Sequence, residues 1–284
     1  MKIGNILKKA TETAATIGKV VLMSRRPSRA ANRPMENNTL IIMGNGPSLR
    51  QTIDRNFTAL MKHDRMAVNF AANAPEFHTL QPTDYILADP HFFEGVSKDE
   101  NVGKLWKNLS EVSWPMRLHI PAKMRDKIPP GFTLPKEITI TGFNMTPGEG
   151  FNCITHPLFR KGLAMPRPRN VMIPAIMEGI RSGYKTIYLT GADHTWIHTL
   201  YVDEKNRVVS IQPHFYKDNA KELDRVAKEY EGYHLHDILG SMTIAFRSYH
   251  QIADFANKEG VEILNATEGS LIDAFRRRPL SDLK

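Results

Sequence analysis

The 284-residue sequence contains a single cysteine, Cys153. One thiol cannot form an internal disulfide, so the sequence excludes a disulfide-stabilised secreted fold and suits a reducing cytosol. No internal repeat is visible. With 41% apolar and 24% charged residues, a chain of this length predicts one large α/β domain or one domain with an inserted lobe.

The first 34 residues have almost no acidic side chains and no long apolar run. They hold eight Lys or Arg against Glu12 alone, which is seven of the eight net positive charges of the chain. Their longest apolar run, Val20 to Met23, is too short for a signal peptide or a membrane span. Apolar residues recur at three- and four-residue steps, which predicts an amphipathic helix over residues 2–23: Ile3, Ile6, Leu7, Ala10, Ala14, Ile17 and Val21.

This basic leader predicts attachment to an anionic membrane surface through residues 1–34. The protein would then be cytoplasmic and peripheral on the inner face of the membrane. Two alternatives stay open: a helix packed on a partner subunit, as in a homo-oligomer, or a disordered basic tail. Nucleic acid is not an expected partner, because the rest of the chain is close to neutral and lacks a basic stripe.

The stretch T-L-I-I-M-G-N-G-P-S-L, residues 39–49, predicts a buried strand, a tight turn and a helix. The turn has glycines for unusual backbone angles, a proline suited to a first helical turn and a serine suited to capping. Such a turn presents backbone N–H groups to a phosphate, although it is neither G-x-G-x-x-G nor a lysine-bearing P-loop. The residues expected at the ligand are Gly44, Asn45, Gly46 and Ser48.

Polar residues also follow other predicted strands. Asn69 ends the strand 66–70, Asp89 follows the strand 85–88, and Gly191 and Asp193 follow the strand 186–189. Ligands of open α/β sheets bind at the carboxyl ends of strands, so Asn45, Asn69 and Asp89 are predicted to converge on one crevice, and Gly191 and Asp193 mark a further strand end of the same kind. The alternative is that each serves only its own turn.

The remaining elements alternate between helix and strand. Predicted helices cover 48–62, 97–108, 171–182, 241–258 and a short segment ending at Arg276, Arg277 and Arg278; predicted strands cover 116–120, 138–141 and 261–264; residues 157–168 are predicted as a basic loop. The domain plan is a leader (1–36), a nucleotide-binding α/β core (37–193), an insert (194–239) and a return of the core (240–284). The insert is rich in His and Tyr. This composition predicts either a lid at the acceptor or an ordinary subdomain.

The motifs GNGPSL, GYKTIYLTGAD, QPHFYKDN and NATEGSLI follow one another in an order that resembles the small bacterial sialyltransferases of glycosyltransferase family forty-two. The resemblance spans most of residues 39–272, and the pterin pyrophosphokinase-like proteins share the G-x-GPSL start. It implies a Rossmann-like, GT-A-type fold: a mostly parallel sheet with helices on both faces and a lid insertion. It also implies a CMP-activated sugar donor, such as a sialic acid or another nonulosonate.

Roles for individual residues follow from the same resemblance. It implies Asn45, Gly46 and Ser48 at the nucleotide phosphates, Asn69 near the sugar or phosphate, Tyr201 at the phosphate from the lid, and His236 at the acceptor. Asn170 is added to the predicted nucleotide-binding residues. The chain departs from the family pattern where Asp89 replaces an asparagine, where Thr195 replaces a tyrosine, and at residues 167–171.

Sugar transfer from a nucleotide requires a base for the acceptor hydroxyl and stabilisation of the leaving phosphate. A histidine suits the base, and His236 is preferred to His234 and His214. No D-x-D motif occurs, and His234 and His236 have no marked third ligand, so no metal site is predicted and Mg²⁺ is not required. The expected acceptor is a precursor of a cell-surface glycan such as lipopolysaccharide or capsule.

Two other functions remain open. A pterin-type diphosphokinase would use ATP and Mg²⁺ with Asp89 and Asp193 as ligands. A non-catalytic nucleotide-binding scaffold would be anchored by the leader.

Overall fold

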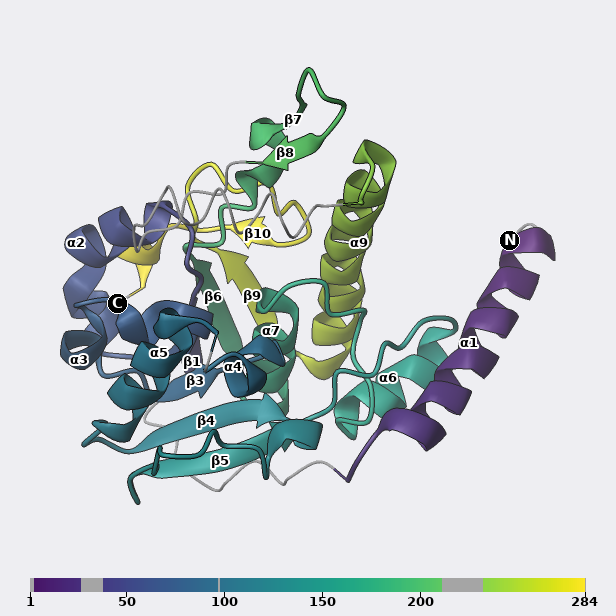
Figure 1. Ribbon diagram of the computed structural model, residues 1–284. Helices are drawn as coiled ribbons and strands as arrows, with labels where there is room; N and C mark the ends of the chain where they lie inside the picture. Colours follow the sequence, from purple (N-terminus) through teal and green to yellow (C-terminus); the bar gives the residue numbers. More distant parts are fainter. Residues whose placement is uncertain (1–2, 27–37, 97, 211–231, 284) are drawn as a thin grey trace.

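The computed structural model describes residues 3–26, 38–96, 98–210 and 232–283. Its centre is an eight-stranded sheet in the order β10-β9-β6-β1-β2-β3-β4-β5, in which every neighbouring pair is parallel (Figure 1). The strands are β1 (Thr39–Met43), β2 (Asp64–Val68), β3 (Asp84–Ile86), β4 (Met116–Pro121), β5 (Ile138–Phe143), β6 (Thr186–Thr190), β9 (Glu262–Asn265) and β10 (Arg276–Arg277). The predicted α/β class with a parallel sheet is confirmed.

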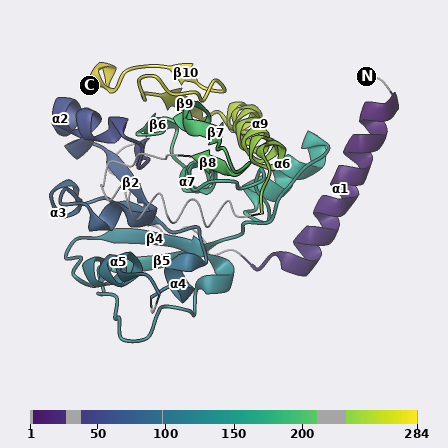
Figure 2. The same cartoon turned by 45° about the horizontal axis from the view of Figure 1, so that its top comes forward.

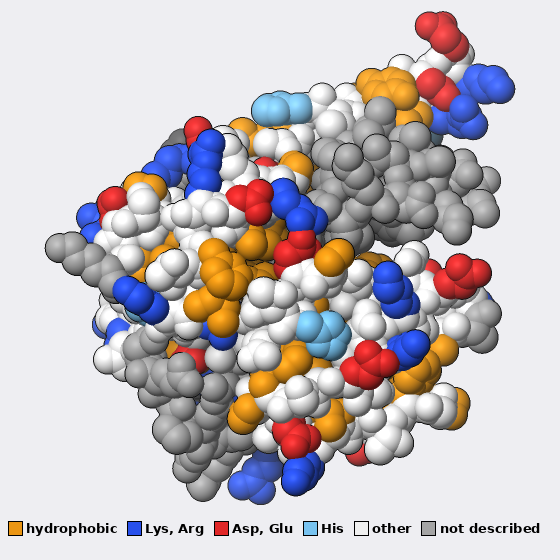
Figure 3. All heavy atoms as spheres, turned by 90° about the vertical axis from the view of Figure 1, so that its left-hand side faces the viewer, with side chains coloured by type: hydrophobic (Ala, Val, Ile, Leu, Met, Phe, Trp, Pro, Cys, Tyr) orange, Lys and Arg blue, Asp and Glu red, His pale blue; other side chains and the backbone are white. Residues whose placement is uncertain are grey.

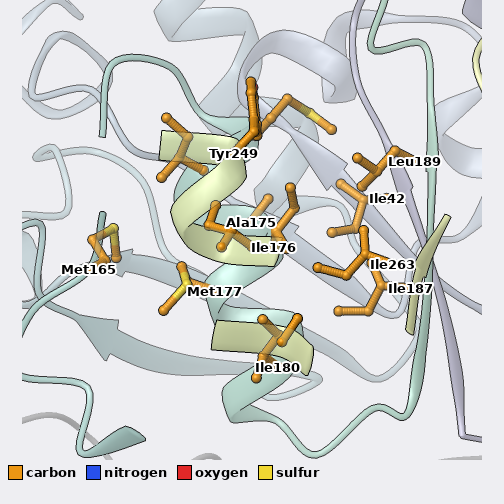
Figure 4. Close-up of a cluster of buried hydrophobic side chains, with 14 of the residues drawn as sticks. Ile42, Met165, Ala175, Ile176, Met177, Ile180, Ile187, Leu189, Tyr249 and Ile263 are labelled. Carbon is orange, nitrogen blue, oxygen red and sulfur yellow. The ribbon is translucent and has the colours of Figure 1, made fainter. Parts of the chain in front are cut away.

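Helices cover both faces of this sheet. They are α1 (Ile3–Met23), α2 (Ser48–Met61), α3 (Phe77–Leu80), α4 (His91–Glu94), α5 (Glu100–Ser110), α6 (Asn152–Arg160), α7 (Met172–Arg181) and α9 (Leu235–Glu259), with short 3₁₀ turns η1 (Asn69–Asn73), η2 (Ala122–Met124), η3 (Thr195–Thr199) and η4 (Leu280–Asp282). Leu40 and Ile42 of β1 pack with α7 and α9 in one core (Figure 4). Ile41 and Met43 pack with α2 to α5 in the other, because successive strand residues point to opposite faces. The predicted helices on both faces are confirmed.

The strand order reverses at β1. From β1 the chain builds β2 to β5 on one side, and then it returns to place β6 and β9 on the other. Crevices of open α/β sheets form at such a switch point, outside the carboxyl ends of the two strands. Met43 at the end of β1 lies between Ala67 of β2 and Thr190 of β6. The turn after β1 therefore meets the loops after β2 and β6.

Three segments differ from the sequence prediction. The first four residues of the predicted basic loop 157–168 are helical and form the end of α6. Pro157 is unfavourable inside a helix, and the edge-on packing of Phe159 against Phe255 offsets this cost. The predicted C-terminal helix is wrong, since Arg276 and Arg277 form β10 against β9. Burial of Ile272 and Phe275 in the core keeps that segment along the sheet.

The long helix α9 begins at Leu235, before the predicted start at residue 241. A capping box explains the earlier start: His234 caps the helix, and the Asp237 carboxylate accepts from the His234 backbone N–H at 3.0 Å. His236 therefore lies in the first helical turn. Its ring is stacked beside that of His234, with the ring centroids 5.9 Å apart.

Helix α1 lies at the edge of the molecule beside α6 (Figures 1 and 2). It docks through two buried threonines. Thr16 Oγ1 donates to the Glu149 carbonyl and accepts from its N–H, and Thr13 Oγ1 accepts from the Phe151 N–H at 2.9 Å. The predicted helix is confirmed, and its polar face is the one that touches the core.

A buried ionic cluster links the sheet to α7. His119 Nε2 lies 2.8 Å from Asp84 Oδ1, and its Nδ1 lies 3.4 Å from Glu178 Oε2. Arg117 donates to Asp84 at 3.0 Å and to the Tyr184 hydroxyl at 2.9 Å. Burial alone would lower the pKa of His119, but the hydrogen bonds to the two carboxylates outweigh it and raise that pKa. The cluster fixes β3, β4 and α7 together around Asp84, which opens β3.

Candidate functional site

A pocket lies at the switch point, where the ends of β1, β2 and β6 meet the start of α7. Its cavity of about 140 Å³ is lined by Gly44, Asn45, Gly46, Pro47, Val68, Asn69, Asn170, Val171, Met172, Gly191, Asp193, His194, Thr195 and Trp196. Seven of the residues predicted at the ligand are in this lining: Gly44, Asn45, Gly46, Asn69, Asn170, Gly191 and Asp193. The structure thus brings together residues that are up to 149 positions apart in the chain.

The turn after β1 is bound tightly to the turn after β6. Gly44 N–H donates to the Thr190 carbonyl at 2.7 Å, and Gly46 N–H donates to the Gly191 carbonyl at 2.8 Å. A Cβ atom on Gly46 would lie 1.9 Å from Asp193 Oδ2 and 2.6 Å from the Gly191 oxygen. Glycine is therefore required at this position by the close approach of two backbone turns.

Asp193 occupies the amino end of α2. Its Oδ2 accepts from the Ser48 hydroxyl at 2.8 Å, and its Oδ1 accepts from the Ser48 N–H at 3.3 Å. Burial raises the pKa of Asp193, and the hydrogen bonds from Ser48 act in the opposite direction. Negative charge is favourable at this end of a helix. The place that the sequence assigns to phosphate therefore holds a side-chain carboxylate.

Three asparagines contribute amide atoms that lack a partner. Asn45 Nδ2 donates to the Val68 carbonyl at 3.0 Å, which leaves its Oδ1 buried and unpartnered. The Oδ1 of Asn69 is also buried and unpartnered, and this residue has a left-handed φ of 49°. Asn170 Oδ1 accepts from the Met172 N–H, while its Nδ2 has no partner. Buried polar atoms are rarely left unpaired, so this group points to a ligand.

His194 is the functional candidate that the sequence prediction missed. It is buried, lines the pocket and has a left-handed φ of 56°. Its Nε2 lies 2.5 Å from the Tyr249 hydroxyl, which itself donates to Asn170 Oδ1 at 2.9 Å. That hydroxyl has one hydrogen, so His194 Nε2 carries the ring hydrogen and Nδ1 is an acceptor. Burial lowers the pKa of His194 to about 3, which keeps the ring neutral.

Two signals in the sequence marked His194: it follows the strand-end Gly-Ala-Asp directly, and it is the first residue of the insert rich in His and Tyr. The partner Tyr249 lies 55 residues later, in α9, so no local spacing connects the two. The indole of Trp196 lies against the imidazole, with ring centroids 4.2 Å apart.

Three predicted site residues lie elsewhere in the structure, and a fourth, His214, is not among the residues it describes. Asp89 is exposed, and it accepts the His91 N–H at 2.8 Å at the start of α4. Tyr201 is half exposed on the hairpin formed by β7 (Leu200–Val202) and β8 (Val208–Ser210). The side chain of His236 is 81% exposed.

Carboxylates do not gather in the pocket. Asp193 is the acidic side chain among its described lining residues, while Asp89 follows β3, which is separated from β6 by β1 and β2. Within the described ranges, no three His, Cys, Asp or Glu side chains are grouped so that they could hold a metal ion.

No protein-family model matches the sequence, and no curated protein matches it at a significant level. Among solved structures, the chain is similar to one described as the MAf glycosyltransferase from Magnetospirillum magneticum AMB-1, with 10% sequence identity and a TM-score of 0.49. The match covers all of this chain and 40% of the other, so this chain spans less than half the length of that protein. A similarity of this degree carries no conclusion about activity.

Proposed function

We propose that the protein is a glycosyltransferase that takes its sugar from a nucleotide-activated donor. The observation that carries the proposal is the pocket at the switch point, where strand-end glycines and asparagines meet and buried amide atoms of Asn45, Asn69 and Asn170 lack a partner. Nucleotides bind at such switch points in doubly wound sheets. The resemblance of GNGPSL and GYKTIYLTGAD to the sialyltransferases supplies the finer part, a CMP-activated nonulosonate.

In the proposed reaction, the oxygen of an acceptor hydroxyl bonds to the anomeric carbon of the sugar. The bond from that carbon to the phosphate oxygen breaks, CMP leaves, and the hydroxyl proton passes to a histidine. His236 keeps the role of base that the resemblance implies. It lies roughly 20 Å along α9 from Tyr249, and the resemblance implies that a lid folds over the donor to bring the base to the acceptor. Tyr201, on the hairpin of the same insert, keeps its proposed role at the phosphate.

The diphosphokinase alternative has less support. It needs Mg²⁺ on Asp89 and Asp193, and the strands that precede them, β3 and β6, have two strands between them, which is roughly 14 Å in the plane of the sheet. A thermal-shift screen with CMP, ATP, GDP and NAD separates the alternatives. CMP-selective stabilisation supports the transferase, ATP-selective stabilisation supports the kinase, and no selectivity supports the scaffold.

A direct assay then tests catalysis. Full-length protein with CMP–sialic acid should release CMP faster when a glycan acceptor is present, and the product should carry one more sugar by mass. CMP release that does not respond to any acceptor contradicts the transferase.

The anionic membrane surface is part of this proposal. Helix α1 leaves the apolar stripe of Ile3, Leu7, Ile17 and Val21 exposed, and such a stripe suits the interface of a bilayer. No helix in the described part of the chain is both long and apolar enough to cross a bilayer. On the face that carries α2 and α3, basic side chains are interspersed with acidic ones (Figure 3). The exposed stripe and the basic excess of residues 1–34 fit an anionic lipid surface that supplies the acceptor, as expected for a precursor of lipopolysaccharide or capsule.

A further inference from the structure

The pocket is short of positive charge. None of the described residues that line it is Lys or Arg, one of them is the acidic Asp193, and burial keeps the ring of His194 neutral. A phosphate placed inside would face a carboxylate with no cationic side chain of the described lining beside it. Such like-charge pairs are unfavourable in a partly buried site.

The backbone donors that usually hold phosphate are also in use. The N–H of Gly46 donates to Gly191, and the N–H and hydroxyl of Ser48 donate to Asp193. The carboxylate of Asp193 therefore occupies the position at the start of α2 that an anionic ligand would take.

The polar atoms left for a ligand are mostly acceptors. The orientation of Asn45 is fixed by its bond to the Val68 carbonyl, so its free atom is the oxygen. Nδ1 of His194 is likewise an acceptor, because Tyr249 holds the hydrogen on Nε2. Such atoms pair with hydroxyl or amino groups, which a ribose and a base present, whereas an ionised phosphate presents acceptors.

The apolar part of the lining suits a flat ring. Val171, Met172 and Trp196 contribute to the walls of this cavity of about 140 Å³, and apolar and aromatic walls of this kind accept the face of a base. We infer that this pocket binds the uncharged nucleoside part of the donor, and that the phosphate lies outside it. This inference rests on the proposed function. It differs from the sequence expectation, which placed Asn45, Gly46 and Ser48 at the phosphate.

The test is isothermal titration of the full-length protein with cytidine and with CMP at pH 7.5. We expect the two dissociation constants to agree within about fivefold, because the phosphate gains little from the pocket. CMP binding that is tighter by a factor of about a hundred or more overturns the inference, since the phosphate would then supply much of the affinity.

A charge variant gives an independent measurement. Asp193→Asn should tighten CMP binding by about tenfold relative to cytidine binding, because it removes a negative charge close to the phosphate. Asp254→Asn is the matched control: it makes the same change on the exposed part of α9, outside the pocket, and should leave the ratio as it is. A weaker relative affinity for CMP in Asp193→Asn overturns the inference.

The two proposals fail in different ways. If cytidine and CMP bind alike and no sugar is transferred, the nucleoside site stands and the transferase is wrong. If transfer occurs and CMP binds far more tightly than cytidine, the transferase stands and the nucleoside site is wrong. If neither cytidine nor CMP binds, both proposals are overturned.

Discussion

The exposed stripe of α1 allows a test of membrane attachment that leaves the fold intact. Ile3, Leu7 and Val21 are 77%, 62% and 77% exposed, so the folded protein gains almost nothing from them. The triple variant Ile3→Ser, Leu7→Ser, Val21→Ser should therefore unfold at nearly the same temperature as the wild type. It also keeps Thr13 and Thr16, the residues that dock the helix.

The expected loss of binding follows from the area that the membrane would cover. Complete burial of a Val, Leu or Ile side chain is worth about 1.5–3 kcal/mol, and a helix at the bilayer interface buries roughly half of each. Three side chains then contribute about 3 kcal/mol, which is more than a hundredfold in the partition constant. The basic excess of residues 1–34 adds an electrostatic attraction to anionic lipid, and salt screens this contribution.

Flotation with phosphatidylcholine vesicles, with and without phosphatidylserine, measures this binding. The wild type should float with the anionic vesicles and less so at high salt, and the triple variant should stay at the bottom. Phe57→Ser with Met61→Ser is the matched control, since these α2 side chains are also exposed and lie outside the stripe. Unchanged flotation of the triple variant would refute the reasoning. A change in oligomeric mass without vesicles would assign the stripe to a second copy of the chain.

Three further predictions concern the interior and the site. Gly46→Ala should lower stability by about 2 kcal/mol or more even without a nucleotide, measured by urea unfolding, because its Cβ would meet Asp193 and Gly191. His236→Ala should lower kcat by about a hundredfold or more with little change in donor affinity; if a variant of His234 or His214 loses kcat instead, the assignment of the base is wrong. His119→Gln should cost about 3 kcal/mol at pH 6, measured by urea unfolding. A raised histidine pKa stabilises the fold below the unfolded value of about 6.5, and this contribution is lost as pH rises through the folded pKa, so the cost should fall as the pH is raised; a cost independent of pH contradicts the prediction.

The sequence predicted the sheet because its strands are short apolar runs that end in polar turn residues. The run Leu40–Met43 becomes β1, and the run ending at Leu189 becomes most of β6. Buried parallel strands carry this signal in their own residues, so no distant contact is needed to find them. The same logic predicted that Asn45 and Asn69 lie in one crevice, and both line the pocket, since the carboxyl ends of neighbouring parallel strands meet at one edge of the sheet.

The sequence prediction failed where a distant contact decides the structure. The start of α9 depends on the mutual hydrogen bonds of His234 and Asp237, and the strand β10 depends on the burial of Phe275. Asp89 follows its strand just as Asp193 does, but β3 is two strands away from the switch point. Its carboxylate therefore caps α4 and takes no part in the pocket.

Helix α9 connects the pocket to the insert. Tyr249, in its middle, holds the hydrogen of His194 Nε2, while Ile238 and Met242, nearer its start, pack against Val208 of the hairpin in a small separate core. Trp196 belongs to both groups, because it lines the pocket and contacts this core. A ligand in the pocket would touch His194 and Trp196. His194 contacts Tyr249 in the middle of α9, and Trp196 packs against the small core that joins the hairpin to the first half of α9. Packed side chains thus connect the pocket lining to the hairpin and to the first half of α9, so we expect a ligand in the pocket to alter the packing of both segments.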